Sequence, residues 1–224
     1  MMSSRVIVYI DGFNLYYGLR EKGWKRYYWL DLQKLSNNLL KPDQTLVKIK
    51  YFTARISSGD SNTPTPIRKK MEAKRRRQNC YLEALQTCQK IEIFEGHYLP
   101  KVVNCHKCGS FWPHPEEKMT DVNIATQMLT DAFKNEFDTA LVVSGDSDIV
   151  PPITVILKEF KKKRIIAVFP PERVSVKLKH ATTGYLSISE AKLRKSMFPN
   201  EIKKPDGYIL KRPRRWRRNI RRIP

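Results

Sequence analysis

The sequence has no long apolar run, and it is poor in cysteine, histidine and acidic residues. No stretch approaches the roughly 18 apolar residues of a membrane span. The opening MMSSRVIVYI also lacks the charged, apolar and small-residue regions of a signal peptide. We therefore expect a cytoplasmic protein without a membrane partner. The four cysteines, with no secretory signal, argue against a disulfide framework.

Motifs of several large enzyme classes are also missing. The chain contains no GxxxxGK[ST] loop for nucleoside triphosphates, no GxGxxG after its first predicted strand and no Gly-x-Ser-x-Gly. Outside the stretch 95–118 there is one histidine, His180, and a lone histidine is more often structural than catalytic. These absences argue against nucleotide-driven, dinucleotide-dependent and serine-hydrolase chemistry.

Positive charge dominates the composition. Lysine and arginine number 43 against 22 acidic residues, which gives a formal net charge of +21. Charge so far from zero attracts polyanions, whose counterions are released on binding, so nucleic acid is the first candidate partner. The segment 203–224 alone carries +9.

Two segments concentrate this charge. The first is a predicted helix over 67–88, whose basic half is either a solvated face or a phosphate-contacting surface; its candidate contacts are Arg68, Lys69, Lys74, Arg75 and Arg76. The second is a basic C-terminal tail, 201–224, with Arg214, Arg215 and Arg217. We interpret the tail as a nucleic-acid-binding arm with Tyr208 and Trp216 as stacking groups, against the alternative of a solvated extension.

Strands and helices are predicted to alternate along the chain. Strands are expected at 5–10, 46–53, 90–94, 140–143, 164–169 and 185–188, and helices in between, with an irregular stretch at 95–118. Such alternation indicates an α/β fold: a mainly parallel sheet of about five to six strands with helices on both faces. We expect one domain over 1–200, including the irregular stretch, followed by the tail.

Acidic residues follow two of these strands and open one helix. Asp11 ends the first strand, and Asp146 and Asp148 follow the apolar run 140–143. Thr120 is predicted to cap the next helix, with Asp121 in its first turn and an apolar stripe that includes Val122 and Phe133. Ligands bind at the carboxyl edge of open parallel sheets, and crowded carboxylates need a cation such as Mg²⁺ or Mn²⁺.

Three ordered motifs carry a family resemblance. VYIDGFNLYYGLR at 8–20, EEKMTDVNIATQML at 116–129 and VVSGDSDIVPPI at 142–153 resemble the NYN domain family (LabA/DUF88-like) of PIN-like ribonucleases. The resemblance implies a PIN-like three-layer sandwich in which Asp11, Asp121 and Asp146 hold Mg²⁺ or Mn²⁺. By the same analogy, Asp148 binds metal or orients water, and Asn14 positions Asp11 or a water. Ser144 is expected to hydrogen-bond to these acidic residues. Lys118 either contacts the scissile phosphate or is a plain exposed lysine.

The irregular stretch contains a second candidate metal site. Cys105-x-x-Cys108 followed by glycine has the spacing of a zinc knuckle. His114 is the expected third ligand, and His97 or His106 the fourth. The alternatives to structural zinc are a redox pair or unpaired thiols.

These observations predict a metal-dependent endoribonuclease acting on single-stranded or structured RNA. Two alternatives stay open: a regulatory protein that binds nucleic acid without cleaving it, and a nuclease that acts on DNA. The sequence leaves the oligomeric state open, a homodimer included.

Overall fold

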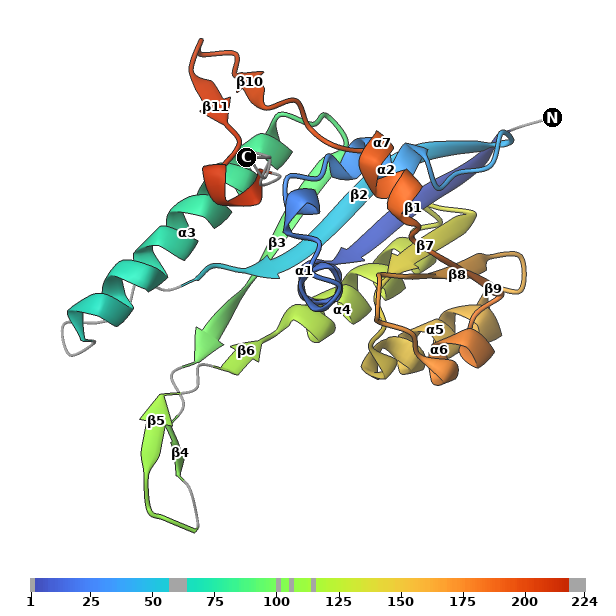
Figure 1. Cartoon of the computed structure of the whole chain (residues 1–224). Helices are drawn as coiled ribbons and strands as arrows, with labels where there is room; N and C mark the ends of the chain where they lie inside the picture. Colours follow the sequence, from blue (N-terminus) through green and yellow to red (C-terminus); the bar gives the residue numbers. More distant parts are fainter. Residues whose placement is uncertain (1–2, 57–63, 100–101, 105–106, 114–115, 218–224) are drawn as a thin grey trace.

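The computed structural model describes residues 3–56, 64–99, 102–104, 107–113 and 116–217. Its main sheet has seven strands, which in spatial order are β6 (Glu116–Lys118), β3 (Ile91–Leu99), β2 (Gln44–Ala54), β1 (Ser4–Asp11), β7 (Thr139–Val143), β8 (Arg164–Phe169) and β9 (Gly184–Ser187) (Figure 1). Six of them run parallel, and the short β6 pairs antiparallel with β3. The predicted mainly parallel sheet is confirmed.

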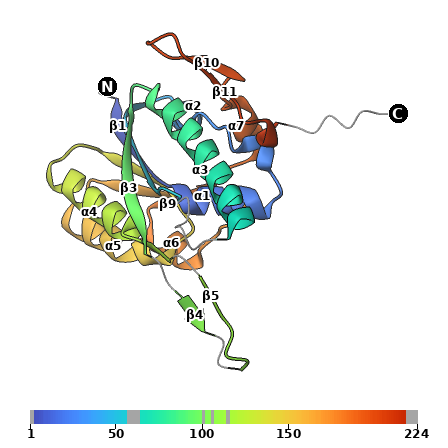
Figure 2. The same ribbon diagram turned by 90° about the vertical axis from the view of Figure 1, so that its left-hand side faces the viewer.

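Two layers of helices cover the sheet, because the strands are apolar on both faces. In β1, Val6, Val8 and Ile10 pack in one core cluster, whereas Ile7 and Tyr9 pack in the other. The first cluster is completed by α1 (Gly12–Glu21), α2 (Leu32–Asn37), α3 (Thr65–Gln86) and α7 (Glu190–Lys195), and the second by α4 (Thr120–Phe133), α5 (Val150–Glu159) and α6 (Val176–Ala181). Figure 2 shows the two sets on opposite sides of the sheet. The fold is therefore a three-layer α/β sandwich, as the resemblance implies.

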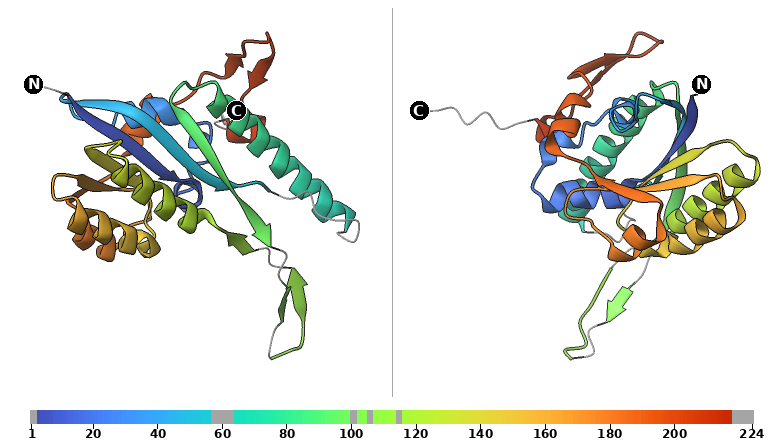
Figure 3. Two further views of the ribbon diagram at one scale, coloured as in Figure 1. Left: turned by 180° about the vertical axis from the view of Figure 1, so that it is seen from behind. Right: turned by 90° about the vertical axis from the view of Figure 1, so that its right-hand side faces the viewer.

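The stretch predicted to be irregular is partly regular. Strand β3 continues to Leu99 instead of ending at Phe94, and β4 (Val102–Asn104) pairs antiparallel with β5 (Phe111–Pro113). This β4–β5 pair extends away from the body of the molecule (Figures 1 and 3). The added pairing follows from the β-branched and aromatic residues in these segments.

The start of α4 also differs from the prediction. Met119, at a φ of 78°, occupies the N-cap position, and Thr120 is the buried first residue of the helix. The left-handed residue turns the chain sharply out of β6. Val122 and Phe133, expected in the core, are 64% and 67% exposed.

The C-terminal segment packs against the domain as far as it is described. Its β10 (Glu201–Lys203) and β11 (Ile209–Lys211) form an antiparallel pair, followed by the 3-10 turn η3 (Arg214–Trp216). The Trp216 ring lies 5.8 Å from Tyr28, 6.3 Å from Trp29 and 6.3 Å from Tyr81. This packing contradicts the alternative of a solvated extension for residues 201–217. Among all the described helices, none is long and apolar enough for a membrane crossing.

Candidate active site at the carboxyl ends of strands β1 and β7

Asp11 is a buried carboxylate at the junction of β1 and α1. It is 3% exposed and caps α1 by accepting the Asn14 backbone N–H at 2.9 Å. Its second oxygen accepts from the Asn14 side-chain amide at 2.6 Å and from the Ser144 hydroxyl at 3.0 Å. The structure thus places Asn14 directly against Asp11 and holds the carboxylate in one orientation.

The loop after β7 is tied to Asp11 through Ser144. The fully buried Ser144 hydroxyl donates to Asp11 and accepts the backbone N–H of Asp146 at 3.0 Å. The Gly145 N–H donates to the Asn14 side-chain oxygen at 3.2 Å, and Asp146 accepts from the Asp148 N–H at 3.0 Å. The last bond makes Asp146 the cap of the 3-10 turn η2 (Ser147–Ile149). One hydrogen-bonded network therefore joins the ends of two neighbouring parallel strands.

The electrostatics of this network favour a bound cation. Burial raises the pKa of Asp11 above its usual range, and the Asp146 carboxylate raises it further, while the hydrogen bonds from Asn14 and Ser144 act in the opposite direction. Tyr51 on β2 lies close by: burial raises its pKa to about 12, and Asp11 adds to the shift. Tyr51 is thus a neutral hydroxyl near neutral pH, and it brings no positive charge to offset Asp11.

Asp121 and Asp148 belong to the same edge of the sheet but are placed differently. Helix α4 runs from this edge back to the start of β7, so the half-buried Asp121 in its first turn lies at the carboxyl side, and α4 packs against η2 and β1. Asp148 is exposed. Across the described part of the chain, no three His, Cys, Asp or Glu side chains are grouped so that they could hold an ion. The expectation that Asp11, Asp121 and Asp146 share one ion is not confirmed.

The pair formed by Asp11 and Asp146 nevertheless suits a hard divalent cation. Mg²⁺ usually keeps several waters and binds through one or two carboxylates together with substrate phosphates, so it does not need a cage of protein ligands. A cation beside this pair would relieve both the burial cost of the Asp11 charge and its repulsion by Asp146. The donor set therefore fits Mg²⁺ or Mn²⁺.

The candidate zinc ligands are only partly within the described residues. Cys105, His106 and His114 lie outside them, so the zinc site stays a prediction. Cys108 is exposed, and its thiol donates to the Ser110 hydroxyl at 3.3 Å.

His97 lies on β3 opposite Lys118 of β6. This register places both side chains where the sheet leads out towards the β4–β5 pair, past the carboxyl ends of the parallel strands.

The two basic segments meet in space. On α3 the candidate phosphate contacts are all exposed, namely Arg68, Lys69, Lys74, Arg75 and Arg76, and Arg214, Arg215 and Arg217 are exposed in the C-terminal segment. Burial and the nearby Arg215 guanidinium lower the pKa of Arg77 on the same helix. Helix and tail thus form one positive surface.

Sequence reasoning missed Arg173, which follows β8. A Cβ atom on Gly145 would lie 2.7 Å from the Arg173 carbonyl oxygen, so the loop after β8 is in close contact with the loop 144–148. We call the loop 144–148 the acidic loop. The Arg173 guanidinium pairs with Glu21 at the end of α1. No local motif marks this arginine, because its position depends on the packing of two loops.

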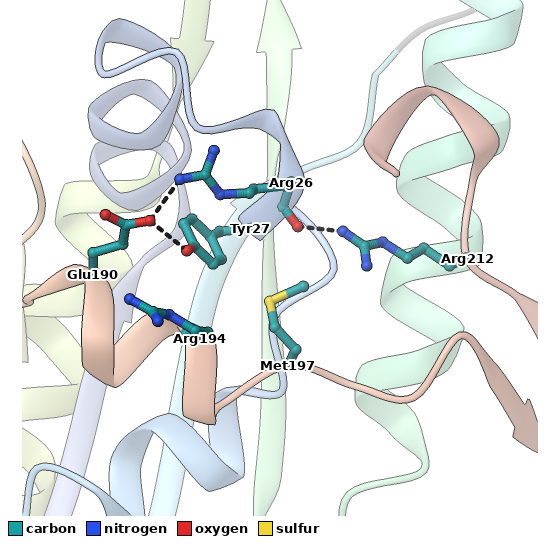
Figure 4. Close-up of a pocket in the computed structure, with 6 residues that line it drawn as sticks. All are labelled: Arg26, Tyr27, Glu190, Arg194, Met197 and Arg212. Atoms are coloured by element: carbon teal, nitrogen blue, oxygen red, sulfur yellow. Dashed lines mark hydrogen bonds and ion pairs between the residues drawn. The ribbon is translucent and has the colours of Figure 1, made fainter. Parts of the chain in front are cut away.

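A cavity of about 370 Å³ is lined by none of these residues. It lies between the 3-10 turn η1 (Lys25–Tyr27), α7 and the C-terminal segment (Figure 4). Arg26 and Tyr27 both donate to Glu190, at 2.5 and 2.8 Å, and Arg212 donates to the Arg26 carbonyl. These bonds fasten α7 and the C-terminal segment to the domain, so we assign them a structural role.

Comparison with known proteins places these features in context. The model of the NYN domain matches residues 5–189, which contain the six parallel strands apart from Ser4 at the start of β1. Over 185 residues the chain is 29% identical to 6-hydroxy-3-succinoylpyridine 3-monooxygenase HspA of Pseudomonas putida; the match covers 68% of this chain and 55% of that protein. The chain thus spans about half the length of this curated relative.

A solved structure shares the fold. The crystal structure of a protein of unknown function from Vibrio parahaemolyticus superimposes with a TM-score of 0.51 at 17% identity. The similarity covers 88% of this chain and 98% of the other.

Proposed function

The chain belongs to the NYN domain family, and from this premise we propose that it is a metal-dependent endoribonuclease that hydrolyses RNA phosphodiester bonds. NYN domains are part of the PIN-like superfamily and are generally nucleases. The observation that carries the proposal is the network in which the Ser144 hydroxyl joins Asp11 to Asp146. Two carboxylates fixed at one sheet edge, within a strongly basic protein, suit phosphodiester hydrolysis.

Each acidic residue has a proposed role. Asp11 and Asp146 would hold Mg²⁺ or Mn²⁺, which when bound polarises the phosphate and lowers the pKa of water. Asn14 keeps Asp11 oriented, as its two hydrogen bonds indicate. Asp121 and Asp148 would accept hydrogen bonds from the water that attacks the phosphate.

The substrate is proposed to follow the positive surface. Lys118 would contact the scissile phosphate, and the exposed arginines and lysines of α3 and the C-terminal segment would contact phosphates further along the RNA. Such contacts position the polyanion without reading its sequence.

The test is cleavage of labelled RNA by purified protein with Mg²⁺, Mn²⁺ or EDTA. Asp11→Asn and Asp146→Asn should abolish metal-dependent cleavage while thermal unfolding stays cooperative. Asp43→Asn is the matched control, because Asp43 is exposed and precedes β2, at the opposite edge of the sheet. If both site variants cut as fast as the parent protein, the assignment of the site is wrong.

Two alternatives give different results in the same assay. A non-cleaving regulatory protein would bind RNA in EDTA and leave every RNA intact with every metal. A nuclease for DNA would cut a DNA oligonucleotide faster than the RNA of matched sequence. The pair of Asp11 and Asp146 supports the cleaving protein, since a second carboxylate beside the buried Asp11 is costly unless a cation is bound.

The similarity to HspA raises an oxidative alternative. That protein is a 6-hydroxy-3-succinoylpyridine 3-monooxygenase. Such an activity here would consume the pyridine substrate in the presence of oxygen and a reductant, which chromatography detects. The positive surface favours the nuclease, since a small pyridine substrate does not need so large a positively charged area.

A further inference from the structure

Two exposed tyrosines lie on the helix that Asp11 caps. Tyr16 and Tyr17 of α1 are 41% and 39% exposed, and their rings contact each other edge to face with centroids 5.3 Å apart. Of the aromatic side chains whose burial the structure describes, five are exposed, and the others are buried or half-buried; the five are Tyr16, Tyr17, Phe133, Tyr185 and Tyr208. An exposed pair of rings beside a candidate site therefore calls for a partner with apolar faces.

Tyr17 is adjacent to the acidic loop. It lies three residues after Asn14, so the two side chains share one face of the helix. Asn14 bonds to Asp11 and to Gly145, and Arg173, which packs on Gly145, has its guanidinium 5.9 Å from the Tyr17 ring centroid. The exposed rings of Tyr16 and Tyr17 therefore lie next to the hydrogen-bonded network of Asp11 and Asp146.

From there the aromatic rings continue to the C-terminal segment. Tyr16 lies 5.0 Å from Tyr28, and Tyr28 lies 5.8 Å from Trp216, measured between ring centroids. We call Tyr17, Tyr16, Tyr28 and Trp216 the aromatic track. Because Tyr28 and Trp216 are half-buried, they support the track, while Tyr16 and Tyr17 present the open faces.

Arginines flank the aromatic track along its length. The Arg20 guanidinium lies 5.7 Å from the Tyr17 ring, and Arg77 is close enough to Tyr16 and Arg215 for each to affect its pKa. Within the described ranges, no carboxylate forms an ion pair with Arg77, and burial and Arg215 together lower the pKa of Arg77. The geometry agrees, since the ring of Tyr81, one turn after Arg77 on α3, lies 6.3 Å from the ring of Trp216, which follows Arg215. Two neighbouring cations form a site for an anion.

We propose that the aromatic track binds single-stranded RNA and leads it to the acidic loop. Bases stack on Tyr16 and Tyr17, and Arg20, Arg77 and Arg215 contact the phosphates. Stacking on an aromatic ring strengthens binding roughly 5- to 150-fold per base and is tolerant of sequence. A duplex keeps its bases stacked inside, so it cannot use these rings. This role rests on the proposed ribonuclease function, because that function is the reason for the bound RNA to lead to the acidic loop.

The experiment measures binding separately from cleavage. Fluorescence anisotropy in EDTA gives the Kd of the full chain for a labelled single-stranded RNA and for the same RNA annealed to its complement. The Tyr16→Ala/Tyr17→Ala variant removes both stacking rings and should weaken single-strand binding at least about 25-fold. The Tyr16→Phe/Tyr17→Phe variant, which keeps both rings, should stay within about twofold of the parent.

Tyr185→Ala is the matched aromatic control. Tyr185 is exposed on the edge strand β9, with the Lys179 ammonium 4.7 Å from its ring. Its replacement by alanine should leave RNA binding unchanged. If the double alanine variant fails to fold, RNA carrying 5-bromouridine is cross-linked to the parent protein instead, and the peptide containing Tyr16 and Tyr17 should carry the adduct.

Charge is tested in parallel. Arg77→Ala/Arg215→Ala should reduce the slope of log Kd against log salt by about 1–2. Lys161→Ala/Lys162→Ala removes two exposed cations just before β8, at the opposite edge of the sheet, and serves as the control for net charge alone. An equal change in both variants would contradict a specific role for the arginines.

The outcomes separate this inference from the proposed function. Unchanged single-strand binding in the double alanine variant, or an equal loss for the duplex, overturns the aromatic track even if the protein cleaves RNA. Selective loss of single-strand binding supports the track even if no cleavage is found, in which case the ribonuclease proposal fails alone.

Discussion

Removing the Ser144 hydroxyl should uncouple the two halves of the candidate site. The hydroxyl donates to the buried Asp11 carboxylate and accepts from the Asp146 N–H, both at 3.0 Å. Ser144→Ala keeps the backbone and nearly the same volume, but leaves one carboxylate oxygen and one N–H with a partner fewer. We therefore expect a loss of stability together with a misplaced Asp146.

The size of the effect follows from the two bonds. A hydrogen bond to a charged group contributes about 1.5–3 kcal/mol, and a buried donor left unsatisfied costs about 1–3 kcal/mol. Partial relaxation of the loop reduces their sum, so Ser144→Ala should lower the free energy of unfolding by about 2–4 kcal/mol. Cleavage should fall roughly tenfold to a hundredfold, as expected when a catalytic group moves by about 1 Å.

A double-mutant cycle with Asp11→Asn tests the reasoning. Urea unfolding gives the free energy of each variant, and Ser144→Ala should cost about 1 kcal/mol less when Asn replaces Asp11, because the bond is then no longer charge-assisted. Ser147→Ala is the control in the same loop and should stay within about 0.5 kcal/mol of the parent. A coupling free energy below about 0.5 kcal/mol, with cleavage unchanged, would refute the role given to Ser144.

Three further predictions concern neighbouring features. Gly145→Ala should cost about 1–3 kcal/mol and impair cleavage, because its Cβ would meet the Arg173 carbonyl at 2.7 Å, whereas Gly184→Ala, with its nearest neighbour at 3.5 Å, should be almost neutral in unfolding assays. Lys50→Met should lower the free energy of unfolding by about 3–5 kcal/mol, because the buried Asp131 loses its ion pair at 2.8 Å. Lys48 is exposed, and an effect of Lys50→Met as small as that of Lys48→Met would contradict this. Burial raises the pKa of Cys88 to about 12, so mass spectrometry should show it alkylated at pH 8 at least tenfold more slowly than a model peptide thiol; an equal rate would show that the thiol is not shielded.

The sheet could be predicted from local sequence because its strands are short apolar runs with clear ends. Arg164–Phe169 has the predicted bounds, and the acidic residues after β1 and β7 mark where these strands stop. Helix α4 was predicted less well: Val122 and Phe133 were expected in the core but are exposed, whereas Asp131 is buried. It faces inward because Lys50 and the Tyr9 hydroxyl bind it, at 2.8 and 2.6 Å. Because these two partners of Asp131 belong to other elements, the periodicity of α4 alone could not predict that Asp131 is buried.

The meeting of Asp11 and Asp146 was predictable in outline, because neighbouring parallel strands end at the same edge. A hydrogen bond from Ser144 to the acidic residues was also expected, but its particular partners, the Asp11 carboxylate and the Asp146 N–H, were not, since they depend on the direction of one hydroxyl. Trp216 was expected on an exposed arm, whereas the rings of Tyr28, Trp29 and Tyr81 surround it. A tryptophan among arginines looks the same in sequence whether it stacks on a base or on the protein's own aromatic residues.

On the proposed function, the opposite charges of the site and of its surroundings predict that cation and RNA assist each other's binding. The positive surface attracts phosphates, but the last phosphate to enter would approach Asp11 and Asp146, which repel it. A divalent ion at this pair removes the repulsion, and the phosphate in turn supplies oxygens that the two carboxylates leave open. By linkage, the parent protein should bind RNA more tightly than the Asp11→Asn variant when Mg²⁺ or Mn²⁺ is present. In EDTA the order of the two affinities should reverse, because the variant lacks one negative charge.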